Sequence, residues 1–218
     1  MKEFKINQNE LSQRRQKPVA QSTAILLAAG ESKRMGLLKA LLPWQGRTML
    51  EHQVNSLFEG GLDKIIVVLG HRKEKLLLLL KDHEYVSPIY NPNYLSGKTS
   101  SIKCGLAQIH ATDTDYVMLL NVDQPRSSHL IRTLAQYHES SKSLITIPSF
   151  NGKGGHPIIF DIALLPDLLK IEESTQGIKS VVTQNQDSLQ KMDVCHEEVL
   201  WDLNTPEEYQ KISAKFKA

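Results

Sequence analysis

The sequence predicts an α/β fold built on a mostly parallel sheet. Two observations lead to this prediction. Short apolar runs without polar alternation recur along the 218-residue chain, as expected of strands buried on both faces. Segments of helical composition separate these runs. Strands that alternate with helices in this way form right-handed βαβ units, which produce parallel strand pairs.

The expected strands are apolar segments that end in small or polar residues. The first, residues 23–29, ends at Gly30, and the second, residues 64–69, ends at Gly70. A glycine directly after a buried strand lets the chain turn sharply at the edge of the sheet. The remaining expected strands are residues 86–90, 116–120, 144–148 and 156–160.

Helices are expected between these strands and after the last one. Their expected ranges are residues 48–60, 71–82, 100–110, 128–140, 164–170, 177–183 and 203–215. The last helix has Thr205 as its N-cap and Pro206 at its first position, a favoured pair at helix starts. The leucines at 76–80 place apolar groups all round their helix, which favours burial in the domain.

Composition argues against two classes of partner. Lysine and arginine total 26 against 24 aspartates and glutamates, which gives a net charge of +2 at pH 7. A nucleic-acid-binding protein normally carries a strongly basic surface. No apolar run approaches the roughly 20 residues that cross a bilayer. We therefore expect neither a nucleic-acid partner nor a membrane association.

The cysteine count and the N-terminal segment suggest where the protein resides. Cys104 and Cys195 are too few for a disulfide framework, and no CxxC or Cys/His cluster indicates zinc. We expect reduced thiols in a cytoplasmic protein. Residues 1–22 are polar, lack the apolar stretch of a secretory signal, and are interpreted as a solvated or loosely ordered arm. Residues 23–218 are interpreted as a single domain.

The loop after the first expected strand has the composition of a polyphosphate-binding loop. Ala28, Ala29 and Gly30 allow a ligand to approach the backbone, and backbone N–H groups in such a turn can bind an anion. Arg34 and Lys39 add a forked guanidinium and a point-charge ammonium. Neither the GxGxxG nor the GxxxxGK[ST] spacing is present. The alternative is an ordinary solvated basic loop.

Two aspartates are candidate metal ligands. Asp123 follows the buried segment 116–120, and Mg²⁺ in proteins favours one or two carboxylates together with substrate phosphates. Asp202 lies near the C-terminus and could supply a second carboxylate. The alternatives are a turn aspartate before Pro125 and, for Asp202, a plain helix start.

The order of these motifs resembles the MobA-like nucleotidyltransferases. LAAGESKRMGLLKALLP at 27–43 is similar to the family signature, which reads roughly LA(A/G)GxSxRMGxxK. The later blocks resemble the molybdenum cofactor cytidylyltransferase branch: SGKTSSIKCGLA at 96–107, NVDQPR at 121–126, GGHPIIF at 154–160 and DLNTPEEY at 202–209. The resemblance spans residues 23–209. It implies a three-layer, Rossmann-like nucleotidyltransferase fold.

The resemblance also implies a role for individual residues. Arg34, Lys39 and Asp123 would be catalytic, Asp123 and Asp202 would hold Mg²⁺, and His156 would lie near the acceptor pocket. The nucleotide would be bound by Leu27, Ala28, Ala29, Gly30, Arg34, Lys39, Gly70, Asn91, Ser101 and Asp123. The implied reaction transfers CMP from CTP to molybdopterin, and a molybdoenzyme apoprotein would receive the product.

The sequence departs from the family pattern at two positions. Asn204 replaces the second aspartate of the usual DxDTPEDY block, which weakens that position as a metal ligand. Val122 replaces the usual glycine before the aspartate and narrows the room for phosphates. Ala29 stands where the guanylyltransferase branch usually has glycine, so the resemblance points toward cytidine at this position, while the choice of CTP against GTP or ATP stays open. The open alternatives are transfer to a sugar or polyol phosphate, and a non-catalytic carrier or chaperone of the molybdenum cofactor.

Overall fold

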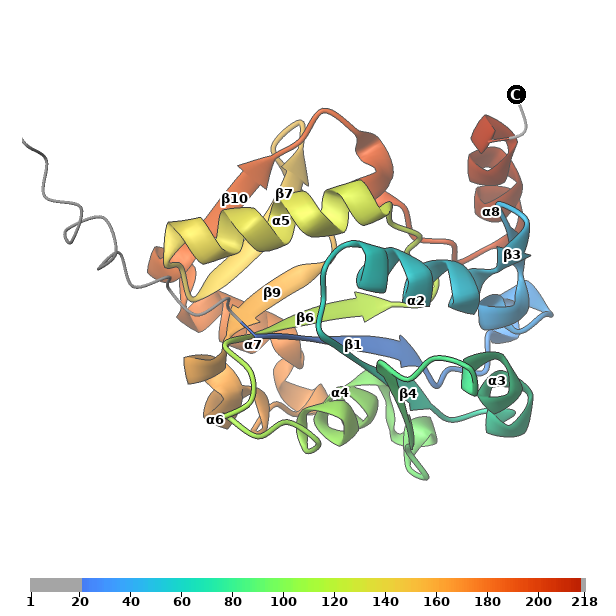
Figure 1. Ribbon diagram of the computed structural model, residues 1–218, viewed down its shortest axis with the longest axis horizontal. Helices are drawn as coiled ribbons and strands as arrows, with labels where there is room; N and C mark the ends of the chain where they lie inside the picture. The colour runs from blue at the N-terminus through green and yellow to red at the C-terminus, as the bar shows by residue number, and fades with distance from the viewer. Residues whose placement is uncertain (1–20, 217–218) are drawn as a thin grey trace, which may run out of the picture.

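The computed structural model describes residues 21–216, which form a central sheet covered by helices on both faces (Figure 1). The eight-stranded sheet has the order β10-β7-β9-β6-β1-β4-β5, with β8 paired to β7. Its strands are β1 (Ser22–Ala28), β4 (Lys64–Leu69), β5 (Val86–Tyr90), β6 (Tyr116–Asn121), β7 (Ile145–Phe150), β8 (Lys153–Gly154), β9 (Ile158–Asp161) and β10 (Leu189–Asp193).

Most neighbouring strands run parallel. The pairs β1–β4, β1–β6, β4–β5 and β10–β7 are parallel, whereas β9 runs antiparallel to both β6 and β7. Outside this sheet, β2 (Pro43–Trp44) and β3 (Arg47–Thr48) form an antiparallel hairpin. The predicted fold class, a mostly parallel α/β sheet, is confirmed.

The helices divide between the two faces of the sheet. One face carries α2 (Met49–Glu59), α3 (Lys73–Leu80) and α5 (Ser128–Ser141), and the other carries α4 (Lys98–Leu106), α6 (Leu165–Leu168) and α7 (Ile178–Gln184). Figure 1 shows α2 and α5 above the sheet and α4 and α6 below it. The last helix, α8 (Pro206–Ser213), lies beside the β2–β3 hairpin, where the Tyr209 hydroxyl donates to the Pro43 carbonyl.

Strand β1 is buried on both faces because its side chains alternate between two hydrophobic cores. Ala24 and Leu26 belong to the core under α2 and α5, whereas Ile25 and Leu27 belong to the core over α4 and α6. A period of two residues sends successive side chains to opposite faces. This accounts for the uninterrupted apolar run that predicted the strand.

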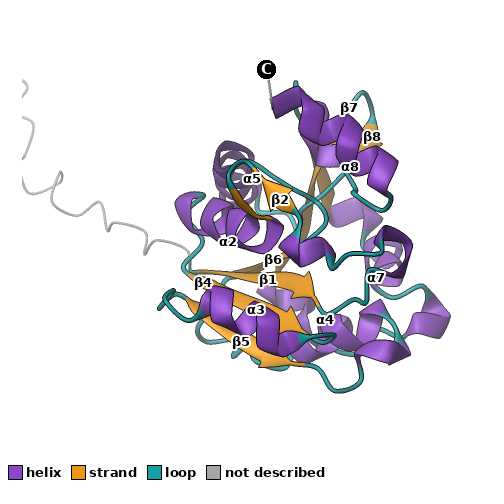
Figure 2. Cartoon of the chain, turned by 90° about the vertical axis from the view of Figure 1, so that its right-hand side faces the viewer, coloured by secondary structure: helices purple, strands orange, loops and turns teal. Residues whose placement is uncertain are grey.

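The strand order reverses between β1 and β6. From β1 the chain builds β4 and β5 on one side, and then returns to place β6 on the other. In open α/β sheets, ligands bind beyond the carboxyl ends of the strands at such a reversal. Figure 2 views the molecule from the side toward which β1 and β6 point in Figure 1. The loops after β1 and β6 therefore meet at the position expected for a ligand.

Some elements differ from the sequence prediction. The hairpin and β8 are too short to produce a pattern, and β10 has only Met192 buried, so no apolar run marks it. The predicted arm, residues 1–22, lies outside the described residues except for Gln21 and Ser22, and Ser22 already belongs to β1. The leucine-rich helix is buried on one side only: Leu78 is 69% exposed, whereas Leu76 is fully buried.

Candidate active site

A cavity of about 540 Å³ opens at the carboxyl ends of β1 and β6. We call it the β1–β6 cavity. It is bordered by the loop after β1, the loop after β6, the start of α4 and the segment before α8. Its lining residues include Leu27, Ala28, Gly30, Arg34, Lys39, Lys98, Asp123, His156, Asp202 and Asn204. Segments far apart in the sequence thus meet here, as the strand order requires.

Lys39 and Asp123 form an ion pair in the lining of the β1–β6 cavity. The Lys39 Nζ lies 2.7 Å from the Asp123 Oδ2 and donates to the Asn204 Oδ1 at 2.8 Å. Arg34 donates to the same amide oxygen at 3.2 Å. The Asn204 amide oxygen therefore accepts from both cations of the loop after β1, Arg34 and Lys39.

Asp202 reaches the same cavity through a backbone contact. The Leu203 N–H donates to the Asp123 carbonyl at 2.9 Å, which fixes the segment before α8 against the loop after β6. Burial, followed by the negative charge of Asp123, raises the pKa of Asp202 above its usual value. A carboxylate whose charged form is disfavoured in this way gains from a nearby cation.

The donor set fits a divalent cation that the substrate helps to hold. Asp123, Asp202 and the Asn204 amide offer the oxygen ligands that Mg²⁺ and Mn²⁺ prefer. Among the described residues, no three His, Cys, Asp or Glu side chains form a complete metal-binding group. Substrate phosphates would therefore have to complete the coordination.

The loop after β1 turns through left-handed backbone positions. Ser32 has φ 56° and Gly36 has φ 65°, and the Ser32 Oγ accepts from the Lys39 N–H at 3.0 Å. A Cβ added at Gly30 would meet no atom within 4 Å, so the chain here leaves open space beside its backbone. The loop can accommodate a ligand directly against the Gly30 backbone.

Arg126 holds three parts of the site together, and sequence reasoning did not identify it. The residue is 1% exposed, and its guanidinium donates to the carbonyls of His156 at 2.7 Å, Val199 at 2.9 Å and Trp201 at 3.1 Å. Burial lowers the pKa of Arg126 to about 9, which leaves the group charged at neutral pH. Arg126 therefore fixes the β6 loop relative to His156 and the C-terminal segment.

A second cavity, of about 450 Å³, adjoins the first. We call it the apolar cavity, because its lining includes Ile102, Leu119, Ile158, Ile178 and Val182. Lys98 and His156 line both cavities. Burial, with the nearby charges of Lys98 and Arg126, lowers the pKa of His156 to about 3. His156 is therefore a neutral imidazole at physiological pH.

Four predicted nucleotide-binding residues lie outside the lining of the β1–β6 cavity. Ala29 is buried, and its carbonyl accepts from the His71 N–H at 3.0 Å. A Cβ at Gly70 would lie 2.5 Å from that carbonyl, so Gly70 supports the loop from behind. The Asn91 Nδ2 donates to the Ser101 Oγ at 3.0 Å, and both side chains are buried. Their roles at the nucleotide stay predictions.

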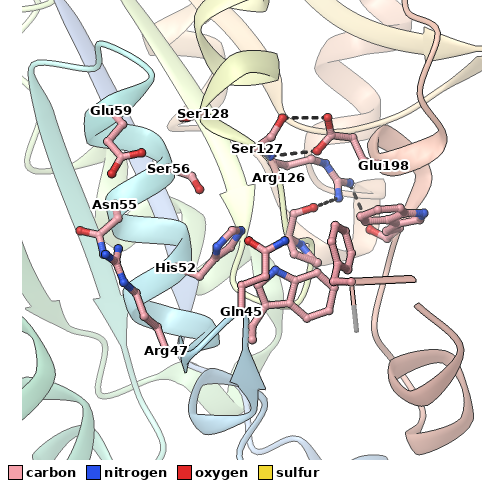
Figure 3. Close-up of a pocket in the computed structure, with 14 residues that line it drawn as sticks. Gln45, Arg47, His52, Asn55, Ser56, Glu59, Arg126, Ser127, Ser128 and Glu198 are labelled. Atoms are coloured by element: carbon pink, nitrogen blue, oxygen red, sulfur yellow. Dashed lines mark hydrogen bonds between the residues drawn. The ribbon is translucent and has the colours of Figure 1, made fainter. Parts of the chain in front are cut away.

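A third cavity, of about 370 Å³, lies on the other side of the Asp123–Arg126 loop, between α2 and the start of α5 (Figure 3). Here Glu198 accepts from the Ser127 N–H at 2.9 Å and from the Ser127 hydroxyl at 2.8 Å. Burial lowers the pKa of His52 to about 4. The start of α5 thus already holds a carboxylate of the chain itself.

Comparison with known proteins identifies the family. Residues 24–189 match the model of the MobA-like NTP transferase domain. The chain belongs to this family. The MobA-like domain covers β1 through the start of β10 and therefore includes both loops that carry Lys39 and Asp123. The resemblance found in the sequence motifs is confirmed, and the protein is a nucleotidyltransferase by family.

The relatives of this MobA-like domain carry different names. The chain is 27% identical over 192 residues to the molybdenum cofactor cytidylyltransferase of Escherichia coli, covering 88% of this chain and 94% of that protein. It is also 27% identical over 197 residues to the nicotine blue oxidoreductase of Paenarthrobacter nicotinovorans, covering 87% and 95%. Among solved structures, a nucleotidyl transferase from Methanothermobacter superposes with a TM-score of 0.76 at 22% identity, covering 90% and 98%.

Two general properties follow for the MobA-like domain. Its family acts on nucleoside triphosphates and generally uses divalent metal ions, for which the cavity offers oxygen ligands. No helix within residues 21–216 is long and apolar enough to span a membrane.

Proposed function

We propose that this protein is a Mg²⁺-dependent cytidylyltransferase that transfers CMP from CTP to molybdopterin and releases pyrophosphate. The observation that carries the proposal is the cluster of Lys39, Asp123, Asp202 and Asn204 in the β1–β6 cavity. In this cluster, Lys39 offers a positive charge that would bind phosphates, and Asp123 and Asp202 offer carboxylates that would bind a metal ion. A polyphosphate with its metal ion requires this combination.

The triphosphate would bind along the loop after β1. Open space beside Gly30 admits the phosphates to the backbone, and Arg34 and Lys39 supply positive charge from the same loop. On binding, Lys39 would exchange its bond to Asp123 for a bond to a phosphate oxygen. Its partner Asn204 would keep the ammonium in position during the exchange.

Asp123 and Asp202 would hold the magnesium ion together with the phosphates of CTP. Bound Mg²⁺ supplies charge neutralisation at the reacting phosphates. The pKa of Asp202, raised by burial and then by the charge of Asp123, favours such an arrangement, because a bound cation stabilises the charged form of the carboxylate. Release of the Lys39 ammonium from Asp123 makes that carboxylate available at the same moment.

The apolar cavity would receive the acceptor. Its aliphatic side chains suit a flat ring system such as a pterin better than the hydroxyl-rich ring of a sugar phosphate. The relative named molybdenum cofactor cytidylyltransferase supports the same acceptor. His156, neutral and positioned by its carbonyl bond to Arg126, lies between this cavity and the nucleotide.

In the reaction, an oxygen of the acceptor phosphate attacks the α-phosphorus of CTP, and the bond from that phosphorus to the bridging oxygen breaks. Pyrophosphate leaves with the electron pair. The attacking phosphate is already anionic at neutral pH, so no side chain has to remove a proton from it. The residues therefore act by positioning and by charge, the main means of catalysis in phosphoryl transfer.

The proposed activity would take place in the cytoplasm. Cys104 and Cys195 are both free thiols, which suits a reducing compartment. A molybdoenzyme apoprotein would be the recipient of the cytosine dinucleotide product.

The direct test is turnover. Purified protein is mixed with Mg²⁺, one of CTP, GTP or ATP, and one acceptor, either molybdopterin or a sugar or polyol phosphate, and pyrophosphate release is measured. We expect release with CTP well above that with GTP or ATP. Preference for another nucleotide would show that the enzyme uses that nucleotide in place of CTP. Release only with a sugar or polyol phosphate would show that the acceptor is not molybdopterin. No release with any pair would favour a cofactor carrier over an enzyme.

A further inference from the structure

Lys98 lies at the boundary between the two cavities. It is the first residue of α4, directly after Gly97, and its side chain lines both the β1–β6 cavity and the apolar cavity. Only His156 shares this double position among the described residues that line these two cavities. A ligand that extends from one cavity into the other must pass both side chains.

The Lys98 ammonium is available to a ligand. Within residues 21–216, the lysine ion pairs involve Lys33, Lys39, Lys170 and Lys215, and Lys98 is not among them. The residue is exposed and lines both cavities. Desolvation by the surrounding atoms lowers the pKa of Lys98, and the carboxylates of Asp123, Asp202 and Glu173 oppose that shift. Besides Arg34 and Lys39, the lining of the β1–β6 cavity thus holds a further cation, Lys98, which has no ion pair within residues 21–216, whereas Lys39 is paired with Asp123.

The backbone of Lys98 is held firmly. Glu173 accepts from the Thr99 N–H at 3.0 Å and so caps the start of α4. Gly97, at φ 110°, lies so close that an added Cβ would be 2.8 Å from the Glu173 carboxyl carbon. The carboxylate occupies the helix start and leaves the Lys98 side chain directed at the cavities rather than at a partner of its own.

We propose that Lys98 binds the anionic group of the acceptor where the apolar cavity meets the β1–β6 cavity, and so selects acceptors that carry a negative charge next to an apolar ring. This proposal rests on the proposed function. Lys39 already serves the nucleotide side, so a separate cation at the boundary is free to position the attacking oxygen. The reach of a lysine side chain suits this role, since its ammonium can follow the phosphate toward the α-phosphorus.

Lys98→Met tests the assignment, because methionine keeps much of the length of the side chain and removes the charge. Lys98→Arg restores a charge at the same place. Lys103→Met is the matched control, since Lys103 lies on the same helix and lines neither cavity. For each protein, kcat and KM for molybdopterin are measured at saturating CTP, the Kd of CTP with Mg²⁺ is measured by calorimetry, and thermal unfolding verifies the fold.

We expect Lys98→Met to raise the acceptor KM by about tenfold or more, the effect of losing one charge-assisted hydrogen bond. The Kd of CTP should stay within about twofold, and Lys98→Arg should recover most of the acceptor affinity. An unchanged acceptor KM in Lys98→Met, or an equal loss of CTP affinity, would overturn the assignment while wild-type turnover still supported the proposed function. No turnover by the wild type would overturn both.

Discussion

The ammonium of Lys39 lies 2.7 Å from the carboxylate of Asp123, although 84 residues separate them in the sequence. The two side chains meet because β1 and β6 are parallel neighbours whose following loops share one edge of the sheet. In this arrangement, Lys39 occupies the carboxylate that a metal ion would use. Under the proposed function, the ammonium and the metal ion would compete for Asp123 until the phosphates separate them.

Removal of Lys39 should separate metal binding from nucleotide binding. In Lys39→Met we expect Mn²⁺ alone to bind more tightly than in the wild type, because the competing ammonium is gone. Turnover should fall by about two orders of magnitude, as when one charge that stabilises a transition state is lost. Mn²⁺ titration followed by electron paramagnetic resonance checks the first effect, with Lys75→Met on α3 as control. Weaker Mn²⁺ binding in Lys39→Met would show that Lys39 does not compete for the carboxylate.

Substitution by alanine should affect mainly CTP binding at Gly30 and mainly stability at Gly70. Gly30 has open space beside it, so Gly30→Ala should change the free energy of unfolding by less than about 0.5 kcal/mol and weaken CTP binding. At Gly70 a Cβ would meet the Ala29 carbonyl at 2.5 Å, so Gly70→Ala should cost about 1–3 kcal/mol of stability. Urea unfolding and calorimetry measure both. A stable Gly70→Ala with full CTP affinity would contradict the packing argument.

Arg126 should matter for stability as well as for the site. Arg126→Met removes the guanidinium that donates to the carbonyls of His156, Val199 and Trp201, and of these the Val199 carbonyl keeps a second donor, the His156 N–H. We expect a loss of about 3 kcal/mol in the free energy of unfolding, measured in urea. Arg47→Met removes an exposed arginine and should change stability by less than about 0.5 kcal/mol. Equal effects of the two changes would refute the role of Arg126.

The depressed histidine pKa values predict how stability depends on pH. His52, with a pKa of about 4 in the folded protein and about 6.5 when unfolded, binds fewer protons when folded between these values. Stability should therefore fall as pH drops from about 6.5 to about 4, by up to about 1.4 kcal/mol per pH unit for this group. Unfolding free energies of the wild type, His52→Gln and the exposed-site control His110→Gln between pH 4 and 7 check this. An unaltered slope in His52→Gln would contradict it.

The parts of the fold that the sequence predicts are those fixed by local pattern. Uninterrupted apolar runs predict β1, β4 and β6 because both faces of these strands are buried. The capping box of Thr205 and Glu208 marks the start of α8 from local chemistry alone. By contrast, β10 is a partly exposed edge strand whose partner β7 lies more than 40 residues away, so no local signal marks it.

In the site, too, the residues predicted from the sequence are those that a local pattern marks. Lys39 and Asp123 were predicted because each lies in the segment after a recognisable strand, and the parallel pairing of β1 and β6 brings these segments together. Arg126 was missed because its role lies in distant backbone carbonyls, which no sequence pattern displays. Lys98 was missed because lysines near helix starts are usually solvated. Only the meeting of two cavities at Lys98 distinguishes it.

The central claim is that Asp123 joins a metal ion to a cytidine triphosphate in the β1–β6 cavity. Calorimetry tests it most directly: CTP, GTP and ATP are titrated into the wild type and Asp123→Ala, each with and without Mg²⁺. We predict that the wild type binds CTP more tightly than GTP or ATP, that this binding requires Mg²⁺, and that Asp123→Ala abolishes the requirement and most of the affinity. Mg²⁺-independent binding, or equal binding by Asp123→Ala, would contradict the account.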